Sequence, residues 1–395
     1  MRPTLRIALI VPYGVDRRAQ ERVIPALLWL IERLGGEHLV DVLALGQSSK
    51  PFRYQLLGAT VYNLGEVSGE VEEGEIYGLK RWLLWREVMR VARKNGGWDL
   101  IHGFWAGTSG WLAVMEAHRQ GVPSVVSVAG GELAALPDIN YGGQLNWEHR
   151  WEVAETLRLA TRLTVSSNYM RRFVEGHGYH PDIVPLGVDK SCFAPAEVTV
   201  PGKKNSQNNP ASFQNRVWRL LHVAALKPVK DQNTLLKGFR RVVDQFPHVH
   251  LDIIGQDRLK GAIQAQCSAL QLDQHVTFHG FLPNEEVRPF FQHADLFLLP
   301  SRHEAAPVVV LEAAACRVPT VGTNVGYVGD WAGERALAVP VGDADAFAGA
   351  ILSQLRNPQQ RLALGRAAYQ WARTHDADWS AQRFEAIYKS LLKYE

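Results

Sequence analysis

Residues 296–316 read LFLLPSRHEAAPVVVLEAAAC, and this pattern indicates the class of fold. The apolar run Leu296–Pro300 is typical of a strand that is buried on both faces of a parallel sheet. A short polar loop follows, and then a helix is predicted over Pro307–Cys316. Pro307 suits the first turn of that helix because an N–H at this position would have no partner within the helix. A strand, a loop and a helix in this order predict one unit of an α/β fold.

Two glutamates lie on either side of the start of this helix. Glu304 falls between the strand and the helix, and Glu312 falls about a turn and a half into the helix. The N–H groups of residues 308–310 have no acceptor within the helix, so with the helix dipole they form a site for a pyrophosphate. Carboxylates facing a phosphate would repel it, so we expect the two glutamates to accept hydrogen bonds from sugar and ribose hydroxyls beside it. Alternatively, both are ordinary carboxylates stabilised by the helix dipole.

The same alternation of strands and helices extends in both directions along the chain. It predicts doubly wound parallel sheets. Before residue 198 the predicted strands are Leu5–Pro12, Leu39–Leu45, Leu100–His102, Ser124–Val128 and Leu163–Val165, and the predicted helices are Ala19–Leu34, Ser109–Arg119 and Glu148–Leu159. After residue 216 the predicted strands are Arg219–Ala224, Val249–Ile254, Val276–His279, Leu296–Pro300, Thr320–Gly322 and Leu337–Pro340, and the predicted helices are Gln232–Phe246, Leu259–Leu270, Asn284–His293 and Pro307–Cys316.

A polar segment separates the two series. Residues 198–216 carry prolines, a glycine, lysines and asparagines without a core-forming pattern, so they are the predicted linker. We therefore expect an N-terminal Rossmann-like domain over 1–197, a C-terminal Rossmann-like domain over 217–375 and a terminal helix over 376–395. The default ligand site of such a protein is the cleft between the two domains.

Composition and charge narrow the class of protein. The 395 residues are 46% hydrophobic and 21% charged, which excludes a single small module, a coiled coil and a wholly disordered chain. A formal charge of +3 does not indicate nucleic-acid binding. The apolar run Leu5–Pro12 is short and precedes no cleavage site, so we expect a strand and not a signal peptide. Three distant cysteines and scattered histidines predict a reducing, cytoplasmic location and no metal centre.

Lys230 is a candidate phosphate ligand. It follows the first predicted strand of the second series, and ligands bind at such strand ends in open α/β sheets. A lysine there can neutralise a phosphate as a point charge. The alternative is a surface lysine in a loop.

Several motifs, taken in order, resemble those of retaining glycosyltransferases of the family 4 type. Glu304 and Glu312 match the E-x7-E signature of that family, and Val223–Lys230 resembles its phosphate loop. The other landmarks are Val184–Asp189, Phe193–Pro195 and Thr320–Gly326. The resemblance implies the GT-B fold, in which two Rossmann-like domains face each other and the terminal helix packs back on the N-terminal domain. It also implies a UDP or GDP sugar as the donor, with no further cofactor.

Carried onto the matching positions, the resemblance implies a role for each residue. Lys230 becomes the cation for the diphosphate, Glu304 a partner of the donor-sugar hydroxyls and Glu312 a partner of the ribose. Lys230 and Glu304 are therefore the catalytic candidates. Gly14 matches a glycine loop in which the backbone approaches the ligand. The other donor-binding candidates are Ala305, Ala306, Val308 and Val309, which would hold the sugar and phosphates, and Gly280, Phe281 and Leu282, which would lie near the base.

Two residues are candidates for contacting the acceptor or the sugar. His102 ends a predicted strand and could orient a hydroxyl; alternatively, it is a packed histidine bonded to the backbone. Glu132, after the strand Ser124–Val128, is the second candidate. The sequence departs from the family at Ala129, where a histidine is common, and at Ala225, where an arginine is common. The diphosphate charge would then rest mainly on Lys230.

The segment Tyr77–Lys94 predicts an amphipathic helix with six basic residues and one acidic residue. Tryptophans share its apolar side. This combination suits an anionic membrane surface, at which a peripheral enzyme would meet a lipid-linked acceptor on the inner face of the membrane. Alternatively, the tryptophan side packs into the core of the domain.

These observations predict a retaining glycosyltransferase that moves a hexose-type sugar from a nucleotide diphosphate sugar to an acceptor hydroxyl, in glycan, glycolipid or polysaccharide synthesis. The acceptor would be a sugar, a lipid-linked molecule or a small molecule, and nucleic acid is not an expected partner. Two alternatives stay open. One is a nucleotide-sugar epimerase or phosphorylase on the same fold, and the other is a sugar-nucleotide binding protein whose catalysis is impaired by Ala129 and Ala225.

Overall fold

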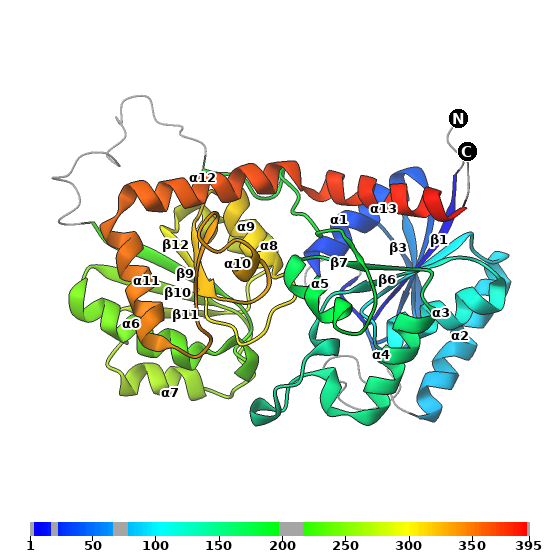
Figure 1. The fold of residues 1–395 in the computed structure, drawn as a ribbon, viewed down its shortest axis with the longest axis horizontal. Helices are drawn as coiled ribbons and strands as arrows, with labels where there is room; N and C mark the ends of the chain where they lie inside the picture. The colour runs from blue at the N-terminus through cyan, green and yellow to red at the C-terminus, as the bar shows by residue number, and fades with distance from the viewer. Residues whose placement is uncertain (1–3, 17–22, 66–77, 197–215, 393–395) are drawn as a thin grey trace. The chain divides into compact units, whose positions relative to one another are not determined.

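The chain forms two compact units (Figure 1). Unit 1 contains Met1–Asp189 and His375–Glu395, and unit 2 contains Lys190–Thr374. The predicted linker 198–216 lies, apart from Arg216, outside the described residues. The computed structural model describes residues 4–16, 23–65, 78–196 and 216–392.

Unit 1 is built on a sheet of eight strands in the order β3-β4-β2-β1-β5-β6-β7-β8. The neighbouring strands are parallel except β3 and β4, an antiparallel hairpin at the edge that the sequence pattern did not predict. The strands are β1 (Arg6–Val11), β2 (Leu39–Ala44), β3 (Phe52–Leu56), β4 (Ala59–Asn63), β5 (Leu100–Phe104), β6 (Ser124–Val128), β7 (Arg162–Val165) and β8 (Asp182–Ile183). The helices are α1 (Pro25–Glu37), α2 (Leu79–Asn95), α3 (Thr108–Gln120), α4 (Trp147–Leu159), α5 (Asn168–Glu175) and α13 (Ala377–Leu392).

Strand β1 explains why its sequence is a continuous apolar run. Ile7 and Leu9 face one hydrophobic cluster, which includes residues of α1 and α13. Ala8 and Ile10 point the other way, into a cluster formed with α2 and α3. Because successive side chains of a strand face opposite sides, helices on both faces require apolar residues at every position.

Helix α1 differs from its predicted bounds. It runs from Pro25 to Glu37, so Gly35 and Gly36, which were expected to end it, lie inside it. A Cβ on Gly35 would come within 2.7 Å of the carbonyl oxygen of Leu57, in the turn between β3 and β4. The glycine therefore serves the close approach of this unpredicted hairpin and does not stop the helix.

The terminal helix α13 belongs to unit 1 and packs against α1. Its Phe384 and Tyr388 are fully buried in the core. The Tyr388 hydroxyl lies 2.7 Å from Nδ1 of His102, at the centre of the sheet. At the helix start, Arg33 of α1 donates hydrogen bonds to Asp378 and to Asp189, at 2.6 and 2.7 Å. The contact between α1 and α13 therefore joins the N-terminal and C-terminal segments of the chain that make up unit 1.

Helix α2 shows which side of the predicted amphipathic helix is core. Leu84, Val88 and Val91 are buried, as the core alternative expects, whereas Trp82 is 46% exposed. Arg81, one of the six basic residues counted in this segment, is buried and donates to Glu152 of α4 at 2.7 Å. Desolvation of a guanidinium is tolerated here because the carboxylate pairs with it. No helix within the described part of the chain is long and apolar enough to span a membrane.

Unit 2 is built on a sheet of six parallel strands in the order β11-β10-β9-β12-β13-β14, with helices on both faces (Figure 1). The strands are β9 (Trp218–Val223), β10 (Val249–Ile254), β11 (Val276–Gly280), β12 (Leu296–Leu299), β13 (Thr320–Thr323) and β14 (Ala336–Val339). The helices are α6 (Gln232–Gln245), α7 (Ala262–Ala269), α8 (Asn284–His293), α9 (Val308–Ala315), α10 (Gly326–Asp330), α11 (Ala344–Arg356) and α12 (Pro358–Thr374).

Each sheet has one point at which the strand order reverses. In unit 2 the neighbouring strands are β9 and β12. The strand that follows β9 in the chain, β10, lies on one side of this pair, and the strand that follows β12, β13, lies on the other side. In unit 1 the corresponding neighbours are β1 and β5. The loops that follow these strands diverge, which opens a crevice at their carboxyl ends where ligands of open α/β sheets bind.

The buried contacts of α13 give a first testable prediction. Phe384→Ala is expected to destabilise the protein by about 3–5 kcal/mol because it leaves a core cavity, and Tyr388→Phe by about 1–3 kcal/mol because it leaves a buried His102 nitrogen unbonded. Phe52→Ala, at an exposed position of β3, is the matched control. Denaturant unfolding followed by tryptophan fluorescence measures all three, and an unchanged midpoint for Phe384→Ala would contradict this role of α13.

Candidate functional site

Two charged side chains meet at the reversal point of unit 2. Lys230 follows β9, Glu304 follows β12, and Lys230 Nζ lies 2.6 Å from Glu304 Oε1. The hydroxyl of Ser301 donates to the same oxygen, also at 2.6 Å. Glu304 is largely buried, and about a quarter of the Lys230 side chain is exposed. The ion pair therefore joins the two loops at the place where a ligand of this sheet is expected.

The loop that carries Lys230 is held by its own backbone. Residues Pro228–Lys230 form a 3₁₀ turn, and Asp231 takes a left-handed conformation with φ of 47°. The Asp231 carboxylate accepts from the N–H of Thr234, which caps α6. The N–H of Arg302 donates to the Val229 carbonyl at 2.8 Å, so a second bond links this loop to the one that carries Glu304.

A third loop approaches Glu304 after β13. Gly326 has φ of +52°, and a Cβ there would lie 3.0 Å from the Glu304 carbonyl oxygen and 2.9 Å from Pro307 Cδ. A side chain would therefore be strained by its backbone angle and crowded by its neighbours. The Thr323 hydroxyl donates to the Ser301 carbonyl, which ties this loop to the other side of Glu304.

His222 lies in β9, the strand that precedes Lys230, and the sequence analysis did not single it out. It is fully buried in β9, its Nδ1 donates to the Leu298 carbonyl at 2.9 Å, and its Nε2 lies 3.2 Å from the Gln232 amide nitrogen. Gln232 in turn donates to the Ala225 carbonyl. Burial lowers the pKa of His222 to about 4, so the ring is neutral and adds no charge beneath Lys230. Only its polar side chain within a predicted buried strand could have drawn attention to it.

Helix α9 begins beside Glu304. It starts at Val308 with Pro307 as its N-cap, and no side chain caps it. The N–H of Val310 bonds to the Pro307 carbonyl at 3.0 Å, so the prediction of a free N–H at this residue is wrong. The N–H groups of Val308 and Val309 have no acceptor among the described residues. They point out of the helix start, together with its dipole, as an anion site requires. Ala305 and Ala306 connect Glu304 to this helix.

Glu312 lies within α9 and is 3% exposed. Burial raises the pKa of its carboxyl group to about 8, because an ionised carboxylate loses its hydration there. At pH 7 the group is therefore mostly protonated and can donate as well as accept a hydrogen bond.

The predicted base-contact segment lies at the end of β11. Gly280 has φ of +68°, and Phe281 is 51% exposed. The Gly280 carbonyl accepts from the N–H of Gly255 at 2.8 Å, and a Cβ on Gly255 would collide with the Ala224 carbonyl at 2.0 Å. The loops after β9, β10 and β11 are therefore in direct contact, and Leu282 continues from them toward α8.

The remaining predicted residues lie in unit 1. The Gly14 N–H donates to Gln47 Oε1 at 2.8 Å, and a Cβ on Gly14 would collide with Ile24, so packing and its φ of +98° already account for this glycine. His102 is fully buried, with Nδ1 bonded to Tyr388 and Nε2 to Ser127, at 2.7 and 2.8 Å. Burial lowers its pKa to about 3. The structure therefore shows the packed alternative for His102, with side chains in place of the expected backbone partner.

Glu132 is buried at the carboxyl edge of the unit 1 sheet. Its Oε1 accepts from the N–H groups of Ala129 and Ala106, at 2.9 and 3.2 Å, while its buried Oε2 accepts no hydrogen bond of normal geometry from the described residues. Burial raises the pKa of this carboxyl group. Trp105, directly after β5 at the reversal point, has φ of +66°, which is rare for a bulky residue. Its indole Nε1 and Glu132 Oε2 both lie within 3 Å of the position that a Cβ on Gly130 would occupy. No sequence pattern singled out Trp105 beyond its place after a strand.

One group of side chains in the described residues has the spacing of metal ligands. Single ligand atoms of Glu37, His38 and Glu385 lie within 4.8 Å of one another. The ammonium of Lys389 lies 2.5 Å from Glu385, and the Leu5 N–H donates to Nδ1 of His38 at 3.4 Å. That bond makes Nδ1 the acceptor and leaves the proton on Nε2, the nitrogen that faces Glu385. Glu385 therefore pairs with Lys389 of its own helix and faces His38 at the end of α1.

Comparison with known proteins matches both halves of the chain to one kind of enzyme. The family described as glycosyl transferases group 1 matches residues 203–371, and the glycosyl transferase 4-like domain matches residues 23–187. A GDP-mannose-dependent monoacylated alpha-(1-6)-phosphatidylinositol monomannoside mannosyltransferase of Corynebacterium glutamicum is 28% identical over 75% of this chain and 77% of its own. A D-inositol 3-phosphate glycosyltransferase of Segniliparus rotundus is 25% identical over 78% of this chain and 70% of its own.

Solved structures support the same fold. The sucrose-phosphate synthase of Thermosynechococcus elongatus superposes with a TM-score of 0.76 and 18% identity, covering 99% of this chain and 100% of that one. Anabaena HepE in complex with UDP and glucose superposes with a TM-score of 0.72 and 16% identity, covering 98% of this chain and 100% of that one. The two parallel sheets, their reversal points and the two matched halves agree on one assignment. The chain belongs to the glycosyltransferases of the family 4 type and has their GT-B fold.

Proposed function

We propose that the protein is a retaining glycosyltransferase that transfers a hexose-type sugar from a UDP or GDP sugar to an acceptor hydroxyl. The observation that carries the proposal is the 2.6 Å contact between Lys230 and Glu304 at the reversal point of unit 2. A cation and a carboxylate at this place supply separate partners for an anionic diphosphate and for sugar hydroxyls. We propose no further cofactor.

In this proposal the ion pair opens when the donor binds. The diphosphate attracts Lys230 and the N–H groups of Val308 and Val309, and Glu304 is released to accept hydrogen bonds from the sugar. As the bond between the anomeric carbon and the phosphate oxygen breaks, negative charge grows on the diphosphate. Lys230 and the dipole of α9 stabilise that charge. The acceptor hydroxyl attacks from the same face that the diphosphate leaves and gives its proton to the departing phosphate oxygen. Attack on this face retains the anomeric configuration.

Glu312 is proposed to bind the ribose. Two vicinal hydroxyls donate more strongly to a carboxylate than to a neutral acid. Because burial raises the pKa of Glu312 to about 8, most molecules hold the acid at pH 7. Donor binding is therefore expected to lower this pKa and to release a proton.

The acceptor is proposed to be a lipid-linked or other sugar acceptor in glycolipid or glycan synthesis. The names of the two relatives support this proposal, since one acts on a phosphatidylinositol mannoside and the other on inositol 3-phosphate. On the acceptor side we place Glu132, which follows β6, bonds to the N–H of Ala106 after β5, and has a buried Oε2 with no hydrogen-bond donor among the described residues. His102 is not included, because both of its nitrogens are bonded within the core.

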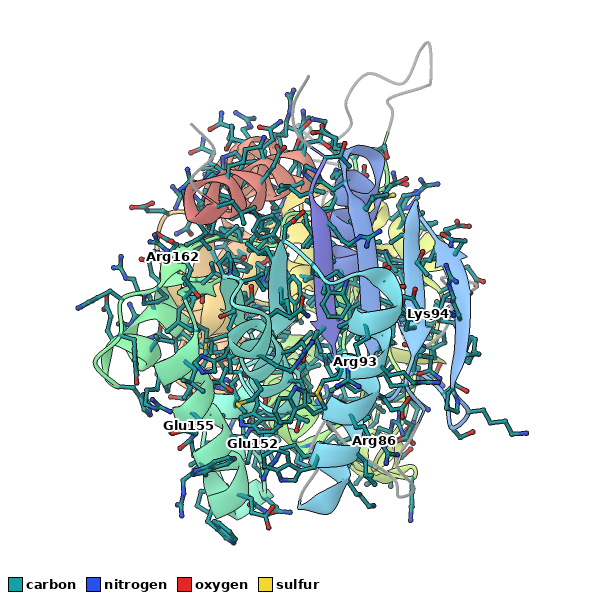
Figure 2. All side chains as sticks on the ribbon, turned by 90° about the vertical axis from the view of Figure 1, so that its right-hand side faces the viewer. Arg86, Arg93, Lys94, Glu152, Glu155 and Arg162 are labelled. Carbon is teal, nitrogen blue, oxygen red and sulfur yellow. The ribbon has the colours of Figure 1, made fainter. Side chains whose placement is uncertain are left out.

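Peripheral binding to the inner face of the membrane is proposed for the surface formed by α2 and α4. Trp82 of α2 and Trp147 of α4 are 46% and 69% exposed. Figure 2 shows Arg86, Arg93 and Lys94 along α2, on the same face of the unit as α4, and all three are exposed. Exposed tryptophans beside basic side chains suit an anionic interface. Tyr77, the start of the predicted amphipathic segment, lies outside the described residues.

Replacing Lys230 tests the diphosphate role. Lys230→Ala is expected to lower kcat/KM on the order of 10²–10³-fold, because it removes a preorganised charge from the transition state. Lys230→Arg should retain part of the activity. Lys237→Ala, an exposed lysine of α6, is the matched control. The assay follows both donor consumption and acceptor glycosylation by mass spectrometry. Undiminished turnover in Lys230→Ala would refute the role, and donor turnover without an acceptor would favour the epimerase or phosphorylase.

The raised pKa of Glu312 gives two linked expectations. A carboxyl group whose pKa rises from 4.5 to about 8 on folding stabilises the folded state less as pH increases between these values. The unfolding free energy of the wild type should therefore fall from pH 5 to pH 8 relative to that of Glu312→Gln, by roughly a few kcal/mol at most.

The second expectation concerns the donor. Calorimetry at pH 7 in buffers of different ionisation enthalpy should show that UDP or GDP binding releases a fraction of a proton in the wild type and none in Glu312→Gln. Nucleotide affinity that is equal in the two proteins, with no proton released by either, would exclude the ribose role.

Vesicle flotation tests the membrane surface. Vesicles with anionic phosphatidylglycerol should carry the wild type, and the triple change Arg86→Gln, Arg93→Gln and Lys94→Gln should weaken binding about a hundredfold, at about 1 kcal/mol per charge. Lys237→Gln combined with Arg366→Gln, at exposed positions of unit 2, is the control. Equal flotation of the triple variant would contradict the proposal.

A further inference from the structure

Unit 2 contains a cavity that the donor site does not use. It has a volume of about 290 Å³ and is lined by residues of β9, β10 and α8, among them Arg219, Asp252, Phe290 and His293. Arg219 is the second residue of β9, whereas Lys230 follows the other end of the same strand. The cavity therefore lies toward the amino ends of the strands, away from the carboxyl edge at which Lys230 and Glu304 meet.

The sheet face beneath α8 is unusually polar. Val249, Leu251 and Ile253 of β10 point into the hydrophobic core on the opposite face. The alternate residues His250 and Asp252 point to the α8 side, beside Arg219 of β9 in the aligned register. Strands of a parallel sheet covered on both faces normally carry apolar residues at all these positions. His250 bonds to the Thr277 hydroxyl at 2.9 Å, which leaves Arg219 and Asp252 as the polar residues of this face that line the cavity.

Two opposite charges line the cavity without pairing with each other. Asp252 is 7% exposed, and its Oδ1 accepts from His279 Nε2 at 2.8 Å. Within the described residues its other oxygen has no donor. Arg219 is exposed, its backbone N–H and carbonyl both bond to Asp295, and its guanidinium has no acceptor among the described residues. The second oxygen of Asp252 is not fully enclosed by protein, so it can accept a hydrogen bond from a ligand in the cavity.

The other walls supply an aromatic face and a second acceptor. The Phe290 ring is held by His279, whose ring meets it edge to face with centroids 4.7 Å apart. His293 donates from Nδ1 to the Pro289 carbonyl at 2.7 Å, so its Nε2 is left as an acceptor. One guanidinium donor, one carboxylate acceptor and one imidazole acceptor thus surround an apolar ring.

We propose that this cavity binds a single neutral sugar residue, as a carbohydrate site separate from the donor site. A pyranose offers several hydroxyls that both donate and accept, and an apolar C–H face that can lie on Phe290. An anion such as a phosphate would be repelled by Asp252, and a simple cation by Arg219. The volume is at the lower end for a ligand pocket, which suits one ring. The site would let the enzyme hold a glycan through a residue that is not reacting.

Ligand-observed NMR tests the proposal on the full-length protein with methyl α-mannoside and methyl α-glucoside, in the presence of saturating UDP or GDP. Saturation transfer to at least one glycoside is expected. Arg219→Gln, Asp252→Asn and Phe290→Leu should each weaken binding about tenfold, as expected for losing one strong polar or stacking contact. Arg366→Gln, at an exposed arginine of α12, is the control and should bind like the wild type.

Separate readouts distinguish this site from the donor site. Glu304→Gln should keep glycoside binding, and the three cavity variants should keep nucleotide-induced thermal stabilisation. Because Asp252→Asn alters a buried residue, Arg219→Gln serves as the variant at an exposed position. The proposal is overturned if the glycosides do not bind, if Arg219→Gln and Phe290→Leu bind them like the wild type, or if the cavity takes a small zwitterion such as glycine and no glycoside. Loss of nucleotide binding with retained glycoside binding would count against the donor site alone.

Discussion

The reversal of strand order between β9 and β12 is the constraint on which the site depends. Because the chain leaves these neighbouring strands in opposite directions, no helix connection covers their carboxyl ends. Lys230 and Glu304 fill that position and hold each other at 2.6 Å. The bonds from Arg302 to Val229 and from Thr323 to Ser301, and the close approach of Gly326, fix three loops around this pair. The backbone bonds of these loops thus hold Lys230 and Glu304 in place, and in the proposed function the donor separates the two charges.

Unit 1 repeats the architecture with different chemistry. Near its reversal point, Trp105 follows β5 with a strained backbone, and Glu132 follows β6 with a buried oxygen that has no donor of normal geometry among the described residues. Strained residues and unsatisfied buried groups persist where the surrounding structure holds them, and they are common at functional sites. The terminal helix α13 stabilises this unit by placing Tyr388 against His102. This contact explains why the buried histidine belongs to the core and not to the ligand site.

The sequence predicted most of the fold because parallel strands buried on both faces leave continuous apolar runs such as Leu5–Pro12 and Leu296–Pro300. It missed the β3–β4 hairpin, whose edge strand is half exposed, and it took Gly35 as a helix end when tertiary contact with Leu57 required it. Single-residue environments were also beyond the pattern. Helical spacing alone did not show that Arg81 is buried against Glu152, nor that both nitrogens of His102 are bonded.

The roles of Lys230 and Glu304 were assigned from motif order, and the structure brings these two residues together. The structure of the protein with bound UDP or GDP tests the central claim most directly. The account predicts that the diphosphate lies at the start of α9, with a phosphate oxygen within about 3.2 Å of Lys230 Nζ and the ribose beside Glu312. A nucleotide bound elsewhere, with the Lys230–Glu304 pair intact, would contradict it.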